Sequence, residues 1–324
     1  MGGGTSFPRE TLDRDRVVIV TGGNTGIGYE TAKWIAMLGA KVIIACRSEM
    51  RALEAIERMK KEYQEEKQKG TNGIIQDGDI YVQFMKVDFA SLQSTKEFIE
   101  TFKSSGQKLH TLVCNAGLGL GPLEDKNELV FQVNYLSQFL LAIHLMPLME
   151  FSGADDCRIV LVSSDGHNLA HPFNASSIQG KHLTEANFEC FRNYANSKLY
   201  QVMQMYFMNR RLKESNISVV STHPGTVETE FGRDMECSRT CCIYCFGHTM
   251  KFCRAETEIY AAIAPQLKGI RDVYYADCKP ATTSSQSRNM ENQEALLKVS
   301  LELLKDYIPE DIVHRWSTTP TTLA

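Results

Sequence analysis

The sequence contains no run of about twenty apolar residues, the length that crosses a bilayer, and this absence predicts that no helix spans a membrane. The amino terminus lacks the apolar core of a secretory signal, so we expect the 10 cysteines to be thiols in a reducing, cytoplasmic compartment. Basic residues form no stripe with interleaved aromatics, and the formal net charge is -4. These absences exclude nucleic acid as an expected partner.

Length and composition favour one large globular domain. A sheet with helices on both faces can occupy most of 324 residues, and a content of 43% hydrophobic and 23% charged residues is ordinary for a folded protein. We expect a flexible tail at residues 1–15, one domain at residues 16–310 and a second tail at residues 311–324.

A glycine cluster separates the first expected strand from the first expected helix. Residues 17–21 are all β-branched, and residues 29–38 are typical of a helix. Glycine lets a backbone approach a ligand closely, and the N–H groups at a helix start attract pyrophosphate. The glycine spacing is looser than the three-glycine dinucleotide fingerprint, so a turn that binds nothing is the alternative. The residues that would line a phosphate cradle are Gly22, Asn24, Thr25, Gly26, Ile27 and Gly28.

Strands and helices alternate along most of the chain. Expected strands lie at residues 17–21, 41–45, 80–87, 111–113, 158–163, 217–222 and 273–275, and expected helices at 29–38, 49–68, 92–103, 130–149, 194–213 and 294–307. This alternation predicts parallel pairing through right-handed crossovers. The expected fold class is α/β, a single-domain doubly wound (Rossmann) parallel β-sheet of about seven strands with helices on both faces. Ligands of such sheets bind beyond the carboxyl ends of the strands.

The residues after the second, third and fourth expected strands are candidate cofactor contacts. Arg47 suits a ribose phosphate, which favours NADP over NAD; alternatively, Arg47 starts the next helix with its charge in solvent. Asp88 either touches an adenine edge or caps the helix that follows. The small residues Asn115, Ala116 and Gly117 would let a flat cofactor lie against the backbone.

A tyrosine and a lysine four residues apart follow the fifth expected strand. On a helix, Tyr194 and Lys198 share one face, so the ammonium group can approach the phenol. A nearby positive charge favours the phenolate and lowers the pKa of a tyrosine from about 10 towards neutrality. Tyr194 is therefore a candidate proton donor and acceptor. Taken alone, such a pair is also common on helix surfaces that have no function.

The order and spacing of these motifs resemble the short-chain dehydrogenase/reductase family. The glycine cradle, residues 114–117, Ser164 and the pair of Tyr194 and Lys198 follow one another as in that family. Residues 41–47, 109–116, 131–136 and 223–225 carry further likeness, and the resemblance covers residues 16–278. Within the family, the chain is similar to the retinol dehydrogenase branch and to the oxidoreductase domain of WW-domain-containing oxidoreductase.

The resemblance implies a catalytic set of Asn134, Ser164, Tyr194 and Lys198. Tyr194 would act as general acid and base, while Lys198 would hold the nicotinamide ribose and favour the tyrosine anion. Ser164 would orient the carbonyl or alcohol, and Asn134 would position a water that links Lys198 to solvent. The nicotinamide carboxamide would be received by Pro224, Gly225, Thr226, Val227 and Thr229.

Two segments depart from the usual pattern of the branch. Residues 135–139 are Tyr-Leu-Ser-Gln-Phe, where the branch usually has His-Leu-Gly-His-Phe. Cys114 replaces the first asparagine of the usual Asn-Asn-Ala-Gly. Neither change removes a catalytic group. The residues that would shape the substrate pocket differ more, and they leave the identity of the substrate open.

Two segments bear on metals and membranes. The resemblance places a substrate flap near residues 230–255, where Cys242 and Cys245 have a zinc-like spacing; no second such pair follows, so no metal is predicted. The thiols of this flap either fill an apolar lid or accept palmitate. The pattern at the amino terminus fits myristoylation of Gly2, with an unmodified tail as the alternative. Two acyl chains would give a peripheral membrane attachment.

The sequence thus predicts an NADP-dependent oxidoreductase, with NAD as the alternative cofactor. It would transfer hydride between nicotinamide and a lipophilic alcohol or carbonyl of the retinoid, steroid or polyprenol-like kind. Two other hypotheses are a cofactor-binding scaffold with little turnover and a reductase of small soluble carbonyls. The four catalytic candidates argue against the scaffold, and the apolar flap argues against small substrates. The sequence does not decide between a monomer and a homodimer, because the apolar face at residues 294–307 packs either on the sheet or on a partner.

Overall fold

The computed structural model describes residues 7–119, 127–180, 190–225 and 255–318. Several predictions made above lie outside these ranges. They concern the myristoylation pattern, Thr226, Val227 and Thr229, and the cysteines of the flap at residues 237–253.

The centre of the protein is one eight-stranded sheet with the strand order β3-β2-β1-β4-β5-β6-β7-β8. The strands are β1 (Val17–Thr21), β2 (Lys41–Cys46), β3 (Val82–Lys86), β4 (Thr111–Cys114), β5 (Cys157–Val162), β6 (Ile217–His223), β7 (Tyr274–Ala276) and β8 (Lys279–Ala281). All neighbours pair in parallel except β7 and β8. The predicted α/β fold class is confirmed, and the strand order reverses between β1 and β4, where such sheets bind ligands.

The eighth strand was not predicted. Its three residues are all exposed and include Pro280, so it has neither an apolar face nor a full set of backbone donors. Short, proline-bearing strands of this kind occur at sheet edges. Strand β8 likewise forms an edge of the sheet, where it pairs with the buried strand β7.

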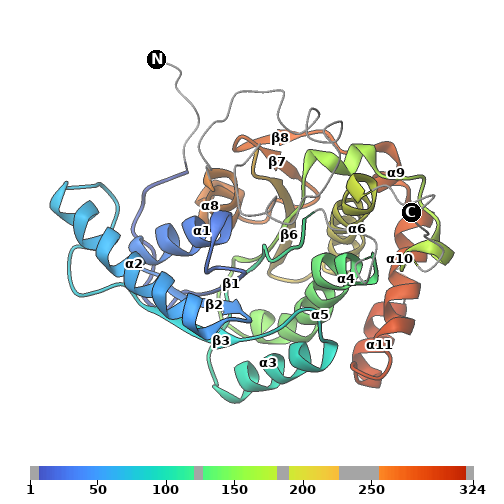
Figure 1. Ribbon diagram of the computed structural model, residues 1–324, viewed down its shortest axis with the longest axis horizontal. Coiled ribbons are helices and arrows are strands. Elements are labelled where there is room, and N and C mark those ends of the chain that lie inside the picture. Colours follow the sequence, from blue (N-terminus) through green and yellow to red (C-terminus); the bar gives the residue numbers. More distant parts are fainter. Residues whose placement is uncertain (1–6, 120–126, 181–189, 226–254, 319–324) are drawn as a thin grey trace.

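Helices cover both faces of the sheet (Figure 1). One layer consists of α1 (Gly26–Met37), α2 (Glu49–Gln68) and α8 (Glu256–Ile263), and the opposite layer of α3 (Leu92–Ser104), α5 (Ser137–Glu150) and α6 (Cys190–Arg211). Strand β1 supplies both cores by alternation: Val18 and Val20 face the first layer, whereas Val17 and Ile19 face the second. Helix α8 was not predicted; its eight residues are too few for a clear period.

The long helix predicted at residues 130–149 is interrupted. Helix α4 (Asn127–Phe131) passes into a π-helical turn, η1 (Gln132–Leu136), before α5 begins. Wide turns of this kind are frequent at functional sites, and this one carries Asn134. The stretch Leu129–Glu150 is long and apolar enough to cross a membrane, contrary to the expectation from the sequence, but 89% of its most apolar window is buried within the protein.

The carboxy-terminal helices belong to the packed domain. The last helices along the described chain are α9 (Ser285–Arg288), α10 (Met290–Leu303) and α11 (Glu310–Ser317). Helix α10 packs on α6, and Trp316 of α11 is 1% exposed within the same core. Residues 311–317, predicted as part of a tail, are thus helical and packed. At the other end, Phe7 is also buried, with its ring against Trp34.

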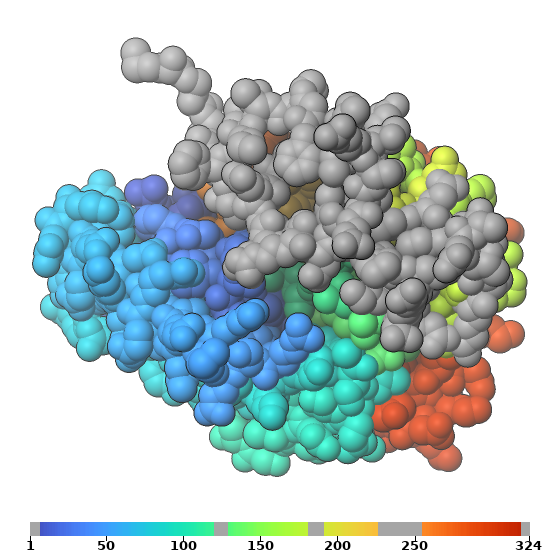
Figure 2. All heavy atoms as spheres, in the orientation of Figure 1, coloured from blue at the N-terminus to red at the C-terminus, as the bar shows by residue number. Residues whose placement is uncertain are grey.

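The space-filling view (Figure 2) shows where these parts reach the surface. The blue segments that include α2 and the red carboxy-terminal helices lie at opposite ends of the face shown. Short helical turns fill the connections: η2 (Asp165–Leu169), η3 (Ala175–Ser177) and η5 (Pro265–Leu267). Of these, η2 packs against α6 and directly follows Ser164.

Helix α8 brings a carboxyl group into the interior. Glu258 is fully buried. Within the described residues, neither its two carboxyl oxygens nor Thr222 Oγ1 has a hydrogen-bond partner. Burial raises the pKa of Glu258 from 4.5 to about 7, with the nearby Thr222 opposing the rise. The neutral acid is therefore the form that the fold tolerates best.

This burial makes the stability depend on pH. The pKa of Glu258 is higher in the folded protein than in the unfolded chain. The contribution of its neutral carboxyl group to stability is therefore complete below pH 4.5 and is lost as pH rises through about 7. We expect Glu258→Gln to raise the free energy of unfolding by up to about 3 kcal/mol at pH 8, with little change at pH 4.5. Urea unfolding at the two pH values measures it. The half-exposed Glu256→Gln is the matched control, and an equal shift in both variants would contradict the assignment.

Candidate functional site

The cradle at the start of α1 is built so that only glycine fits it. Gly22 and Gly26 have φ angles of 66° and 56°, in the left-handed region that other residues rarely adopt. A Cβ atom on Gly28 would lie 2.4 Å from both Gly22 O and Asn115 Nδ2. The backbone of the cradle is therefore pressed against the turn after β4.

The same helix start has no side-chain cap, unlike the starts of α2, α3 and α10. Ser48, Ser91 and Asn289 accept hydrogen bonds from the first turns of α2, α3 and α10. Thr25, which precedes α1, makes no such side-chain bond with the described residues, and the first turn of α1 contains no acidic residue. Uncapped N–H groups beside glycines are suited to a pyrophosphate, so the residues present fit a dinucleotide. Asn24, Thr25 and Ile27 lie in this turn, and all three are at least partly accessible.

Asn115 links β1 to the turn after β4, at the point where the strand order reverses. Its backbone N–H donates to Thr21 Oγ1 at 2.9 Å, and its Nδ2 donates to Thr21 O at 2.8 Å. Ala116 N donates to the same Thr21 hydroxyl at 2.8 Å. These bonds hold the turn of Asn115, Ala116 and Gly117 beside the cradle, so Asn115 shapes the site by supporting its floor.

The two remaining cofactor candidates on this side differ in their surroundings. Arg47 directly follows β2 and is exposed at the start of α2. Asp88 does not cap α3: its Oδ1 accepts from Ala90 N at 3.0 Å, and Ser91 Oγ caps the helix by accepting from Ser94 N. The capping alternative for Asp88 is therefore wrong, whereas the adenine contact stays a prediction.

Lys198 is held by two oxygen atoms in the interior. Its Nζ donates to Val162 O at 2.8 Å, at the end of β5, and to Gln201 Oε1 at 3.0 Å. The side chain is almost fully buried, and burial lowers the pKa of its ammonium group to about 7. Nζ lies 5.5 Å from the centre of the Tyr194 ring, as expected for residues on one face of α6. The fold therefore brings the amino group of Lys198 to the tyrosine.

Asn134 lies near this lysine. From the π-helical turn, its Oδ1 accepts from Leu118 N at 2.7 Å, while its Nδ2 donates to Leu118 O at 3.0 Å and to Ser197 Oγ at 3.0 Å. A Cβ on Gly117 would lie 3.2 Å from Asn134 Oδ1 and 3.7 Å from Lys198 Nζ. Gly117, Asn134 and Lys198 are thus brought together, although they are widely separated in the sequence.

Ser164 occupies the turn between β5 and η2. Its Oγ accepts from Gly166 N at 3.1 Å, which fixes the hydroxyl and leaves its proton available to donate. The preceding Ser163 donates to Lys198 O at 2.8 Å and ties this turn to α6. Pro224 and Gly225, with φ of 81° at Gly225, follow β6 at the same edge of the sheet.

Sequence reasoning missed several residues around this site. Gln201 holds Lys198, while His167 and His223 contact the turn that bears Ser164. The position of Gln201, three residues after the lysine on a helix, is a local signal that could have identified it. His167 lies only three residues after Ser164, a local signal as well, whereas His223 contacts the site through tertiary structure and gave no such signal.

The chain matches the family model described as short chain dehydrogenase over residues 16–176. It is 32% identical over 306 residues to the WW domain-containing oxidoreductase of Gallus gallus, which covers 90% of this chain and 69% of that protein. It is 33% identical over 294 residues to retinol dehydrogenase 11 of Homo sapiens, covering 89% of this chain and 86% of that protein. Both likenesses extend well beyond the segment matched by the family model.

The fold agrees with solved structures. A crystal structure of an uncharacterised protein from Mycobacterium paratuberculosis superposes with a TM-score of 0.68 at 21% identity, covering 93% of this chain and 98% of the other. At that identity the likeness concerns the fold alone. The family model and the relatives that share about a third of their residues over most of their length show that this chain belongs to the short-chain dehydrogenase family, the nicotinamide-dependent oxidoreductases.

Proposed function

We propose that the protein is an NADP-dependent oxidoreductase acting on a lipophilic alcohol or carbonyl of the retinoid, steroid or polyprenol-like kind. The observation that carries the chemistry is the buried ammonium of Lys198, held by Val162 O and Gln201 Oε1 beside the Tyr194 ring. A cation placed there favours loss of the tyrosine proton, which is what a general acid and base needs.

Each side chain has a distinct task in this proposal. Bound nicotinamide would supply and accept the hydride. Tyr194 would give or take the proton of the substrate oxygen, and Ser164 would donate a hydrogen bond to that oxygen. Lys198 would keep the charge that favours the tyrosine anion, and the free lone pair of Asn134 Oδ1 would hold a water on the path of the proton to solvent. The chain itself thus orients the substrate and moves its proton.

The preference for lipophilic substrates is supported by the relatives that carry the name retinol dehydrogenase. A screen tests it: retinoid, steroid and long-chain prenyl alcohols and carbonyls are compared with small soluble carbonyls, each with NADPH or NADP. We expect the highest kcat/KM on a long apolar carbonyl. Turnover of small carbonyls alone would replace the substrate class. Tight cofactor binding without turnover of any compound would favour the scaffold hypothesis.

Arg47 carries the prediction about the cofactor. We expect Arg47→Ala to weaken NADPH binding by about tenfold or more, because a charge-assisted hydrogen bond to a ribose phosphate is lost, and to leave NADH binding nearly unchanged. Fluorescence titration with both nucleotides measures it. Lys60→Ala, on the exposed face of α2, the helix that follows Arg47, is the control. Equal affinity of the unaltered protein for NADPH and NADH would remove the role given to Arg47.

A further inference from the structure

The turn that bears Ser164 is held by two histidines, one within the turn and one in a neighbouring strand. It comprises Ser164, Asp165, Gly166 and His167, and we call it the serine turn. Gly166 N donates to Ser164 Oγ, and a Cβ on Gly166 would lie 3.3 Å from that oxygen. The hydroxyl therefore keeps one orientation only while the backbone of the turn keeps its shape.

His167 fixes the backbone of the serine turn from inside. The ring is fully buried, and its Nδ1 lies 2.7 Å from Ser164 O, while Ser284 N donates to its Nε2 at 3.2 Å. A carbonyl oxygen only accepts and a backbone N–H only donates. Nδ1 must therefore carry the proton and Nε2 must be bare, which makes His167 a neutral imidazole of one defined tautomer.

His223 makes the opposite arrangement on the other side. Asp165 N donates to its Nδ1 at 3.3 Å, and its Nε2 lies 3.3 Å from Asp165 Oδ2. Nδ1 accepts and must therefore be bare, so the single proton of the neutral ring is on Nε2, the nitrogen that faces the carboxylate. The other oxygen of Asp165 accepts from Tyr274 OH at 2.9 Å, so the carboxylate is fixed by β6 and β7 together.

We propose that His167, acting through the carbonyl of Ser164, and His223, acting through Asp165, are positioning residues that fix the Ser164 hydroxyl as neutral imidazoles of opposite tautomers. The inference rests on the proposed function, in which Ser164 touches the substrate. His167 lies after β5, and His223 is the last residue of β6, immediately before Pro224. These two segments meet only in the folded sheet. The same contacts therefore join the serine turn to the segment that would receive the carboxamide.

Protonation would break the clamp formed by these two histidines. A proton on His167 Nε2 would face Ser284 N–H, and a proton on His223 Nδ1 would face Asp165 N–H. Burial lowers the pKa of both imidazoles below 6.5, while Asp165 opposes the fall in each case. Both imidazoles therefore favour the neutral form at pH 7, and the clamp weakens as pH falls through their lowered pKa values. The other titratable groups around the clamp are Tyr274, which contacts both Asp165 and the His167 ring, and Asp277, Tyr194 and Glu258.

Three substitutions at His167 separate positioning from general packing. His167→Asn keeps an N–H near Nδ1, His167→Gln keeps an acceptor near Nε2, and His167→Leu keeps neither. We expect kcat to fall about tenfold or more in the Gln and Leu variants and to recover to within about threefold in the Asn variant, because only Asn can still donate to Ser164 O. The NADPH dissociation constant should stay unchanged in all three variants. The assay uses NADPH with the carbonyl that turns over fastest in the screen, and unfolding midpoints are measured alongside.

The outcomes distinguish the two proposals. Recovery by Gln instead of Asn, equal kcat in all forms, or loss of kcat that follows the unfolding midpoint would overturn the positioning role. Ser164→Ala is the reference: if it retains full turnover, the proposed mechanism fails whatever the histidines do. If Ser164→Ala is inactive while the three His167 variants turn over normally, only the present inference fails.

Tautomers give a readout that needs no substrate. In protein labelled with ¹⁵N-histidine, two-bond proton–nitrogen spectra distinguish the three states of an imidazole. At pH 7.5 we expect His167 as the Nδ1–H form and His223 as the Nε2–H form, assigned with His167→Asn and His223→Asn. An imidazolium ion or the reverse tautomer at either position would overturn the inference.

Discussion

Replacement of Tyr194 by phenylalanine should lower kcat at least about a hundredfold while changing NADPH affinity by less than about threefold. The phenol oxygen is the atom that would exchange a proton with the substrate, and its removal leaves the ring beside Lys198 in place. Because Lys198 is held by Val162 O and Gln201 Oε1, the lysine does not need the tyrosine to stay in position. The loss should thus fall on the chemical step.

Single-turnover kinetics and NADPH fluorescence titration measure the two effects separately. Tyr200→Phe is the matched control, since Tyr200 lies on the same helix with its ring packed against Phe131 and Tyr135 in the core. We expect that control to keep most of its turnover. Undiminished turnover of Tyr194→Phe would contradict the mechanism, and loss of NADPH binding would show that the phenol hydroxyl supports the cofactor.

The sheet and the strand ends could be predicted because their signals are local. A β-branched run before Gly22 and a helix after Gly28 define a strand–turn–helix unit, and alternation of such units requires parallel pairing. That reasoning also placed Arg47, Asn115 and Ser164 at one edge of the sheet, where the structure has them. The glycine spacing acquires its meaning in three dimensions, because a Cβ on Gly28 would strike Asn115.

What could not be predicted depends on contacts between distant segments. The π-helical turn at Asn134 exists where Leu118 and Ser197 bind that side chain, and no periodicity of the sequence records those bonds. The tautomer of His167 is set by Ser284, more than a hundred residues further along the chain. Helix α11 was missed for another reason: eight residues are too few to be helical by propensity alone, so the helix depends on the surface it covers.

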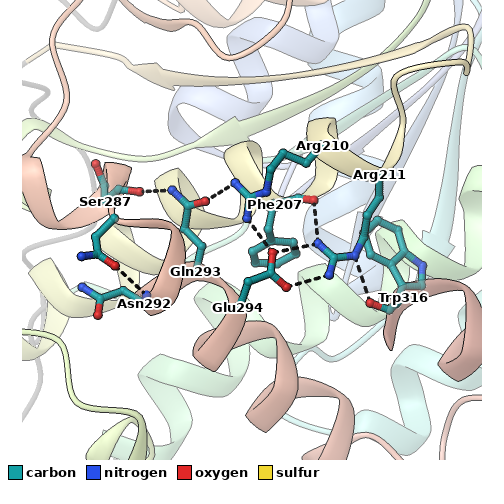
Figure 3. A network of polar contacts seen from close by, with 9 residues as sticks. Phe207, Arg210, Arg211, Ser287, Asn292, Gln293, Glu294 and Trp316 are labelled. Carbon is teal, nitrogen blue, oxygen red and sulfur yellow. Dashed lines mark hydrogen bonds and ion pairs between the residues drawn. The ribbon is translucent and has the colours of Figure 1, made fainter. Parts of the chain in front are cut away.

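Trp316 is the side chain of α11 that covers this surface. Its ring meets Phe139 of α5 at 6.0 Å and Phe207 of α6 at 6.5 Å, both edge-to-face. Its backbone oxygen accepts from Arg211 Nε at 3.0 Å, and the same guanidinium makes a paired contact with Glu294 of α10 (Figure 3). Arg210 also donates to Glu294, so one carboxylate joins α6 to α10 next to the tryptophan.

We expect Trp316→Ala to lower the free energy of unfolding by about 3–5 kcal/mol, the usual cost of removing a buried large aromatic side chain. The cavity would open between α5, α6 and α11, where the surrounding helices are held by the contacts of Glu294 and cannot close it fully. Urea unfolding followed by circular dichroism measures the loss. His314→Ala, on the exposed side of the same helix, should change stability by less than about 0.5 kcal/mol.

Trp316→Phe tests which property of the tryptophan matters. The indole Nε1 has no hydrogen-bond partner within the described residues, so the fold gains nothing from the polar atom and bears the cost of burying it. Phenylalanine keeps the aromatic contacts with Phe139 and Phe207 and should recover more than half of the loss seen with alanine. If both variants were as stable as the unaltered protein, α11 would not be part of the packed domain. If Phe were as damaging as Ala, the indole would have to act through a contact other than ring packing.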